Sequence, residues 1–387
     1  MRGYMNHGVY IHIPFCLKRC IYCDFYSQTD LTLRQPFVDA LIQEMNLVLK
    51  TDGVSDTIYF GGGTPSVLTQ SQLRALCQQA SAQFRIASDS EITMEVNPGT
   101  VSCDDLAFYK QIGVNRLNIG IQSFTADMLE FLGRIHTPRQ AKQTIEDARK
   151  AGFENIGIDL IFGIPGQTPT TWQAELDTAL SFSPQHIAAY MLSIEPGTLL
   201  YRQMQIGTIK PLAEQSLADL FRKTQDILGG ADYEQYEISN YAEIAKNGVN
   251  RRSRHNQKYW SLGPYTGLGP SAHSYRPPHR YWNVRYLQPY LQALSQNRLP
   301  QKSSEKTTRE QQLTETIYLG LRTSDGIDTR RFNQRFNLDF TQAFGDTLKV
   351  FCEDSLMRQS TGRCTLTPKG MLFHESIVSR LLDTLRL

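Results

Sequence analysis

The chain has 387 residues, enough for two or three domains or for one large α/β unit with an appendage. Its 40 basic and 38 acidic residues leave it nearly neutral, so the charge balance gives no sign of a polyanionic partner. No apolar run reaches the ~18 residues of a membrane span, and the N-terminal residues lack the apolar core of a secretion signal. Seven cysteines, three of them bunched together, do not fit a secreted disulfide framework, and we expect a cytoplasmic protein.

Short apolar or β-branched segments alternate with longer segments of helical periodicity in the first half of the chain. The expected strands are 9–13, 57–60, 92–96, 116–121, 156–162 and 186–193. Helices are expected over 36–50, 71–84 and 138–152, with Gly152 as a C-cap of the last. Strand–helix alternation produces parallel strands with right-handed crossovers. We therefore expect an α/β fold with an incomplete TIM-like (β/α)6 barrel, and a doubly wound open sheet is the alternative.

Glycine-rich and polar motifs follow five of these strands directly. In chain order they are FGGGTP, EVNPGT, GIQSF, FGIPGQT and SIEPGT. The carboxyl ends of parallel strands meet at one edge of a sheet or barrel, where such folds place their functional residues. The site is therefore expected at this edge.

The strand–helix periodicity breaks near residue 230. The following segment is rich in Tyr, Trp, His, Asn and Gly, and the polar stretch at 301–310 predicts a linker. Helical segments, a hairpin over 356–370 and a last helix are expected after it. Three regions result: a partial barrel over 1–230, an α/β extension over 231–300 that connects it to the rest, and a small winged-helix-like domain over 305–387.

Cys16, Cys20 and Cys23 form a C-x3-C-x2-C motif on the loop after the first expected strand. Thiolates suit iron–sulfur clusters, and three of them leave one iron of a four-iron cluster open to a small molecule. The alternative is a zinc site completed by His12 or by a distant cysteine, although zinc ligands more often come as paired C-x2-C knuckles.

This motif, with Tyr22 before its last cysteine and GGGTP at the end of the second expected strand, resembles that of radical S-adenosylmethionine (SAM) enzymes. In that family the open iron chelates the amino and carboxylate groups of SAM. The segments YIHIPFC, NIGIQSF, IDLIFGIPGQT and YEISNYA extend the resemblance over nearly the whole chain. They are similar to the group that contains oxygen-independent coproporphyrinogen III oxidase and the heme chaperones.

The resemblance implies roles for particular residues. Cys16, Cys20 and Cys23 would hold a [4Fe–4S] cluster. Tyr10, Gly62 and Glu95 would contact the SAM bound to that cluster. Positions that surround a second SAM in the oxidase are matched by Gly63, Thr64, Gln122, Arg134 and Asp159, with Tyr22 and Ser193 nearby. Carboxylates at strand ends can accept hydrogen bonds from a ribose hydroxyl or an amino group, and an arginine can pair with a carboxylate; surface ion pairs are the alternative.

Three features separate the two kinds of relative. The oxidase has a fourth motif cysteine where this chain has Phe25, and a longer extension than the residues that precede Cys16 here. The segment HNQKYW matches an HNxxYW motif of the chaperones, which makes His255 the expected heme ligand, with His273 and His279 as alternatives. We therefore expect a heme chaperone that binds heme, SAM and a [4Fe–4S] cluster and passes heme to an acceptor protein. The alternative is the oxidase, a radical enzyme that decarboxylates porphyrinogen propionates.

A DNA-binding role for the winged-helix-like region is a third hypothesis. Its arginines are interrupted by acidic residues, so no basic stripe emerges. We therefore expect no nucleic-acid partner.

Overall fold

The computed structural model describes residues 6–49, 53–244 and 248–385. In this part of the chain, the largest sheet has twelve strands in the order β12-β11-β10-β9-β1-β2-β3-β4-β5-β6-β8-β7. Its centre consists of six parallel strands, and each one contains or overlaps a strand expected from the sequence. They are β1 (His7–Ile13), β2 (Ser55–Gly62), β3 (Ile86–Val96), β4 (Arg116–Gln122), β5 (Ile156–Phe162) and β6 (His186–Met191).

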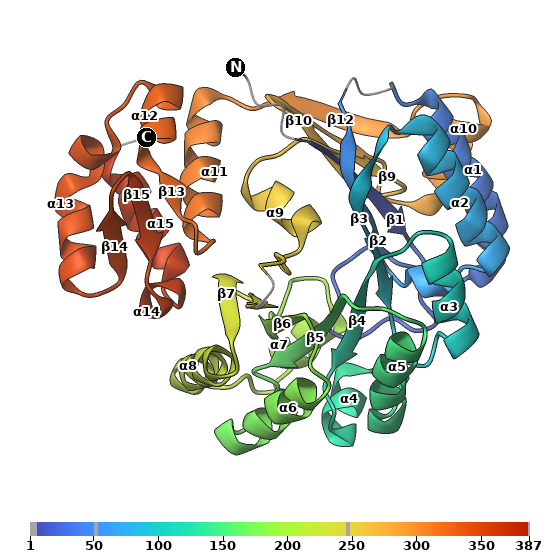
Figure 1. Ribbon diagram of the computed structural model, residues 1–387, viewed down its shortest axis with the longest axis horizontal. Coiled ribbons are helices and arrows are strands. Elements are labelled where there is room, and N and C mark those ends of the chain that lie inside the picture. Colours follow the sequence, from blue (N-terminus) through green and yellow to red (C-terminus); the bar gives the residue numbers. More distant parts are fainter. Residues whose placement is uncertain (1–5, 50–52, 245–247, 386–387) are drawn as a thin grey trace.

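Helices cover the convex outer face of these strands (Figure 1). They are α1 (Arg34–Leu47), α2 (Gln70–Gln83), α3 (Cys103–Gln111), α4 (Ala126–Leu132), α5 (Pro138–Lys150), α6 (Pro169–Ser181) and α8 (Glu214–Gly230); the short α7 (Leu199–Gln205) precedes α8. Capping boxes such as the one between Thr69 and Gln72 fix where several of them begin. The strands are buried on both faces, which explains their nearly continuous apolar sequences.

The expected helix over 36–50 ends at Leu47, and residue 50 lies outside the described residues. The sheet does not close on itself within the described ranges, because its edge strands are β12 and β7. The (β/α)6 unit is thus an open partial barrel, as expected.

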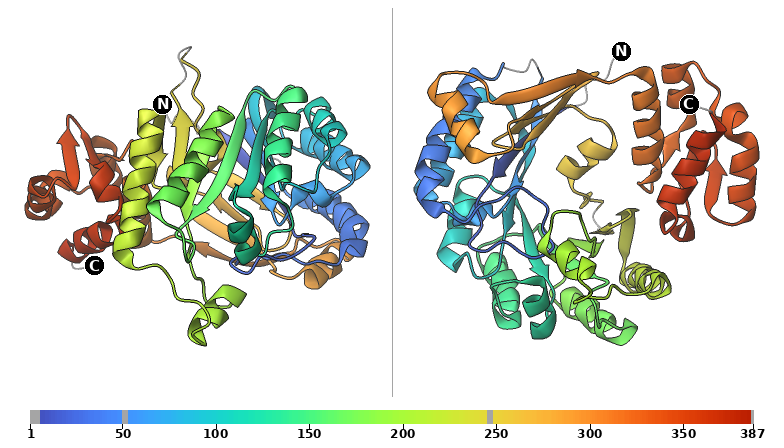
Figure 2. Two further views of the ribbon diagram at one scale, coloured as in Figure 1. Left: turned by 90° about the horizontal axis from the view of Figure 1, so that it is seen from below. Right: turned by 180° about the vertical axis from the view of Figure 1, so that it is seen from behind.

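The region after residue 230 extends this sheet at both edges. Next to β6 lie β8 (Asn240–Glu243) and β7 (Tyr233–Glu237), both antiparallel to their neighbours. At the other edge β9 (Tyr265–Leu268) runs parallel to β1, and β10 (His273–Arg276), β11 (His279–Asn283) and β12 (Gln301–Lys306) follow antiparallel. Helix α9 (Arg254–Trp260) lies on the concave side of the sheet, and α10 (Leu287–Ser295) packs near α1 (Figures 1 and 2).

The prediction of a linker over 301–310 is wrong. Residues Gln301–Lys306 form the edge strand β12, paired with β11 in the register His279 to Lys306, and a helix starts at Arg309. Nearly all side chains of β12 are exposed, because it is an edge strand. Its composition is therefore as polar as that of a linker.

The C-terminal part forms a separate lobe beside the open sheet (Figure 1). A second sheet has the order β13-β15-β14, and the expected hairpin is β14–β15. The elements are α11 (Arg309–Leu321), β13 (Ile327–Asp328), α12 (Thr329–Phe336), α13 (Phe340–Glu353), β14 (Met357–Ser360), β15 (Arg363–Leu366), α14 (Pro368–Met371) and α15 (His374–Thr384). This helix-and-hairpin arrangement agrees with the winged-helix-like expectation. The division of the chain into regions 1–230, 231–300 and 305–387 stays a prediction. Residues 1–5, 50–52, 245–247 and 386–387 of those regions lie outside the described residues.

Within the described ranges, none of the helices combines the length and the apolar character needed to cross a membrane.

Candidate functional site

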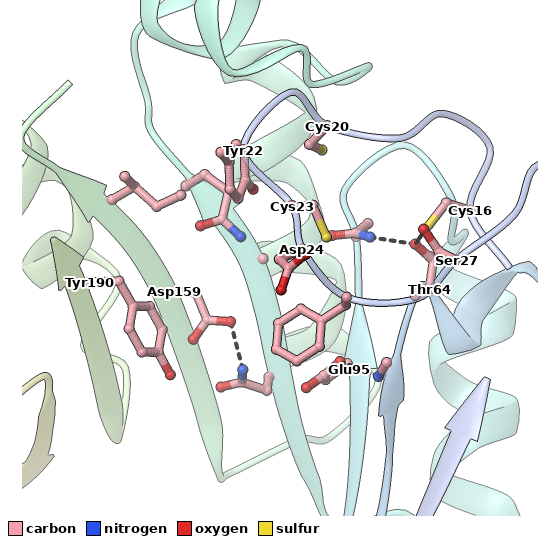
Figure 3. Close-up of a pocket in the computed structure, with 18 of the residues that line it drawn as sticks. Cys16, Cys20, Tyr22, Cys23, Asp24, Ser27, Thr64, Glu95, Asp159 and Tyr190 are labelled. Atoms are coloured by element: carbon pink, nitrogen blue, oxygen red, sulfur yellow. Dashed lines mark hydrogen bonds between the residues drawn. The ribbon is translucent and has the colours of Figure 1, made fainter. Parts of the chain in front are cut away.

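A cavity of about 640 Å³ lies on the concave side of the sheet, toward the carboxyl ends of the parallel strands. Its lining includes every residue predicted to bind the cluster or SAM except Tyr10. His255, the expected heme ligand, is also absent from the lining. Figure 3 shows the cysteine loop above one side of this cavity and Asp159 and Tyr190 on neighbouring strands at the other. The expectation that these residues converge at the strand ends is therefore met.

The cysteine loop is closed at its base. An isolated bridge joins Phe15 to Gln28, and the Cys16 amide donates to the Gln28 carbonyl at 2.9 Å. The amides of Gly63 and Thr64 donate to the carbonyls of Ile13 and Phe15 at 2.8 and 2.7 Å. The loop is thereby attached to the GGGTP turn, which holds the three cysteines against the cavity.

The three thiols of this loop are free and partly accessible. The Thr64 hydroxyl donates to Cys16 Sγ and Arg134 Nη1 donates to Cys20 Sγ, each at 3.5 Å. Burial raises the pKa of the Cys23 thiol to about 11 and also raises that of Cys16. Binding iron would release these protons, since the thiolate is the ligand.

No group of three or more His, Cys, Asp or Glu side chains in the described part of the chain is arranged to hold one metal ion. A four-iron cluster differs from a single ion because each thiolate binds its own iron, so the sulfurs stand farther apart. Three free thiols on one closed loop, two of them already accepting hydrogen bonds, fit this larger group.

Glu95 lies at the floor of the cavity, beside the glycine turn. The Tyr59 hydroxyl donates to one of its carboxylate oxygens at 2.7 Å and the Gly62 amide to the other at 3.2 Å. Gly62 has a φ of +107°, and a Cβ there would lie 2.5 Å from Nδ1 of His12. Burial raises the pKa of Glu95 to about 7. A buried carboxyl group next to bare backbone suits a ligand that brings its own hydrogen-bond donors.

Arg134 and Asp159 line the cavity, and each has one buried polar atom without a hydrogen-bond partner among the described residues. Arg134 Nη2 donates to Asn97 at 2.6 Å and to the Gly120 carbonyl at 2.8 Å, whereas its Nε has no partner among the described residues. Asn118 donates to one oxygen of Asp159 at 2.7 Å, and the other oxygen has no partner in the same set. Burial raises the pKa of Asp159 to about 6. Buried polar atoms are almost always paired, so these two fit a bound polar molecule such as SAM.

Several lining residues were missed from the sequence. They are Tyr59, Asn97, Arg116, Asn118, His186 and Tyr190. Asn118 carried a readable signal, because it is a polar residue within the apolar run RLNIGI. Asn97 also carried one, because it lies in the EVNPGT motif after the third expected strand. The other four gave none, since their position depends on pairing between distant strands.

Tyr10 and His255 lie behind the cavity wall. The Tyr10 hydroxyl is 3.0 Å from His12 Nδ1. His255 is 1% exposed, with its Nδ1 2.8 Å from the Thr57 hydroxyl and its Nε2 2.9 Å from the Tyr259 hydroxyl. Burial lowers the pKa of His255 to about 3. Both ring nitrogens are therefore engaged, and ligation of heme by His255 stays a prediction.

The sequence matches known families in two segments. The radical SAM superfamily matches residues 10–179, and the HemN C-terminal domain matches residues 307–373.

Proteins named heme chaperone HemW are similar to this chain. The one from Bacillus subtilis (strain 168) is 36% identical over 385 residues, which cover 98% of this chain and 100% of that protein. The one from Escherichia coli (strain K12) is 38% identical over 272 residues, which cover 69% of each.

A solved structure has the same fold. Coproporphyrinogen III oxidase (HemN) from Escherichia coli, described as a radical SAM enzyme, superposes with a TM-score of 0.83 over 98% of this chain and 90% of that chain. Its identity of 24% makes this a similarity of fold alone. Full-length identity to the chaperones, a cysteine loop and an open partial barrel lead to one conclusion: the chain belongs to the HemW family within the radical SAM superfamily.

Proposed function

We propose that this protein is a heme chaperone, which binds heme and transfers it to an acceptor protein. The observation that carries the proposal is the 36% identity to a protein named heme chaperone over the full length of both chains. The cavity of about 640 Å³ beside the cysteine loop, here called the cofactor cavity, supports it. Its residues fit the [4Fe–4S] cluster and SAM that the superfamily implies.

Each part of the cofactor set has residues suited to it. Cys16, Cys20 and Cys23 would hold the cluster, and the bound cluster would supply an open iron and a source of single electrons. Glu95 offers a buried carboxyl group near the glycine turn, and Asp159 offers a free oxygen to a hydroxyl or amino group. Arg134 would orient a carboxylate and hold the cavity wall through Asn97.

Tyr10 is proposed to act from behind this wall. Its ring packs against that of Tyr59 with 6.2 Å between centroids, and Tyr59 in turn holds Glu95. Gly63, Thr64, Gln122, Tyr22 and Ser193 complete the proposed lining.

The oxidase alternative is less well supported. Phe25, at the position of the oxidase's fourth motif cysteine, is 66% exposed at the edge of the cavity and offers no thiol. The solved oxidase shares the fold at an identity too low to carry its activity over. A cytoplasmic location goes with the chaperone proposal, because the cluster loop requires reduced thiols.

The test is a heme titration of anaerobically prepared protein, with iron and sulfide measured before and after cluster reconstitution. We expect saturable heme binding, release of that heme to an apo-hemoprotein, and loss of cluster iron in Cys16→Ser. Cys103→Ser is the matched control, because Cys103 is an exposed thiol on α3 away from the loop.

Absence of saturable heme binding by wild-type protein would refute the chaperone function. Conversion of coproporphyrinogen III in the presence of SAM and a reductant would instead support the oxidase.

A further inference from the structure

A second cavity, of about 470 Å³, lies between the antiparallel edge of the large sheet, helix α9 and helix α11. Its floor is formed by side chains from β9, β10 and β11, including Tyr265, His273 and Trp282, and its walls include Tyr259 of α9 and Leu319 of α11. Figure 1 shows α9 and α11 beside this part of the sheet. The volume is in the ~300–1,000 Å³ range of small-molecule sites.

His273 presents an imidazole without partners to this cavity. Its ring stacks on that of Trp282, with 5.7 Å between centroids and 20° between planes. Neither ring nitrogen forms a hydrogen bond within the described ranges, and the residue is exposed. Burial, and secondarily Arg280, lowers the pKa of His273, so the imidazole is neutral at physiological pH. A neutral imidazole is a sound axial ligand for heme iron.

The remaining surface of the cavity suits a flat apolar molecule. Tyr259 and Tyr265 meet edge to face at 4.8 Å between centroids, and Leu319 lies opposite. The two basic residues of its lining already have partners. Arg280 pairs with Glu305 at 3.1 Å and Glu315 at 2.7 Å, and Lys258 pairs with Asp56 at 2.6 Å. The interior of this cavity therefore favours the apolar macrocycle of a ligand. Carboxylate groups of the same ligand would stay at the rim, in contact with water.

The HNQKYW segment connects this cavity to the cofactor cavity. Asn256 lines the cofactor cavity, whereas Tyr259 lines the second one. His255 lies between them and is 2.9 Å from the Tyr259 hydroxyl, which fixes the tyrosine ring. His255 thus supports the wall of the second cavity, and His273 faces its interior.

We propose that heme binds in this second cavity with His273 as an axial ligand of the iron. This assignment rests on the proposed chaperone function, since that function supplies heme as the ligand. It places the heme next to α9, one helix away from SAM and the cluster.

His279 offers a matched control on the neighbouring strand. In the register of β10 and β11, His273 is opposite Trp282 and Tyr275 is opposite Arg280. All four line the cavity, whereas His279 does not. Side chains alternate between the two faces of a strand, so His279 points away from the cavity.

The test is a titration of cluster-loaded protein with hemin, followed by the Soret band and by electron paramagnetic resonance of the heme iron. We expect His273→Ala to lose the imidazole-ligated spectrum and at least about tenfold in affinity. Added free imidazole should restore that spectrum. His279→Ala should match wild type, and His255→Ala should keep the imidazole-ligated spectrum even if affinity falls.

An imidazole-ligated spectrum in His273→Ala equal to that of wild type would overturn the assignment and leave the chaperone function standing. The same holds if His255→Ala or His279→Ala alone loses it. A wild-type protein that binds no heme would refute the chaperone function together with the assignment.

Discussion

The Thr57 hydroxyl and His255 Nδ1 lie 2.8 Å apart and tie helix α9 to strand β2 across 198 residues of sequence. Both side chains are buried, and Glu91 of β3 accepts from the His255 amide at 3.1 Å. The helix that separates the two cavities is thus fixed to the centre of the sheet.

Thr57→Val should destabilise the fold by about 1–3 kcal/mol, because it keeps the side-chain shape but leaves a buried ring nitrogen unpaired. The measurement is the free energy of unfolding by denaturant. Thr93→Val is the matched control: Thr93 is equally buried on β3, but its hydroxyl has no partner within the described ranges. If both variants lose the same stability, the hydrogen bond to His255 does not hold α9 in place.

Glu44→Gln should change how stability depends on pH. Glu44 of α1 accepts hydrogen bonds from Gly269, Asn283 and Tyr290, and burial raises its pKa from 4.5 to about 7. Between these two pH values the folded protein keeps a proton that the unfolded chain loses, so this group's stabilisation decreases as pH rises. The stabilisation lost over this pH range is roughly 3 kcal/mol, because each unit of pKa difference between the folded and unfolded states corresponds to about 1.36 kcal/mol.

The measurement is the free energy of unfolding of wild type and Glu44→Gln from pH 4.5 to 8. The difference between the two proteins should shift in favour of the variant as pH rises. A difference that stays constant over this range would contradict a raised pKa for Glu44.

Gly63→Ala should displace the cysteine loop without touching a cysteine. The added Cβ would lie 2.6 Å from the Phe15 carbonyl oxygen and 2.9 Å from that of Ile13, so the base of the loop has to move. We expect a cost of about 1–3 kcal/mol and a lower iron content after reconstitution. Gly229→Ala on α8 is the control, because its Cβ meets no atom within 4 Å. Normal iron content in Gly63→Ala would show that the loop tolerates the shift.

Glu95→Gln should weaken SAM binding while leaving the cluster intact. The carboxylate can make charge-assisted hydrogen bonds that an amide cannot. Losing them costs ~1.5–3 kcal/mol of binding free energy, which lowers the affinity for SAM tenfold or more. Calorimetric titration of cluster-loaded protein with SAM measures it, alongside iron content. Glu154→Gln, at an exposed position outside the cavity, should bind SAM like wild type. Equal affinities for all three proteins would exclude Glu95 from the SAM site.

The six parallel strands were predictable because each contains a short segment that is mostly apolar. The edge of the sheet where polar residues gather was predictable because glycine-rich and polar motifs follow five of the strands. The roles of single residues came from the family resemblance and stay predictions. The outer strands of the sheet were not predictable. Strands β7 to β12 are short and mixed in polarity, and β12 is polar enough to be taken for a linker. Their pairing depends on partners far away in sequence, as do the hydrogen bonds of His255 to Thr57 and Tyr259.

Strand β1, which leads into the cysteine loop, pairs with β2 on one side and with β9 on the other. The first partner emerges from the ribosome soon after β1, but β9 follows about 250 residues later, a delay of roughly 15–50 s at ordinary synthesis rates. During that interval the strand has an unpaired edge, which is a site where chains associate wrongly. The cysteine loop therefore reaches its final support only when two thirds of the chain has been made.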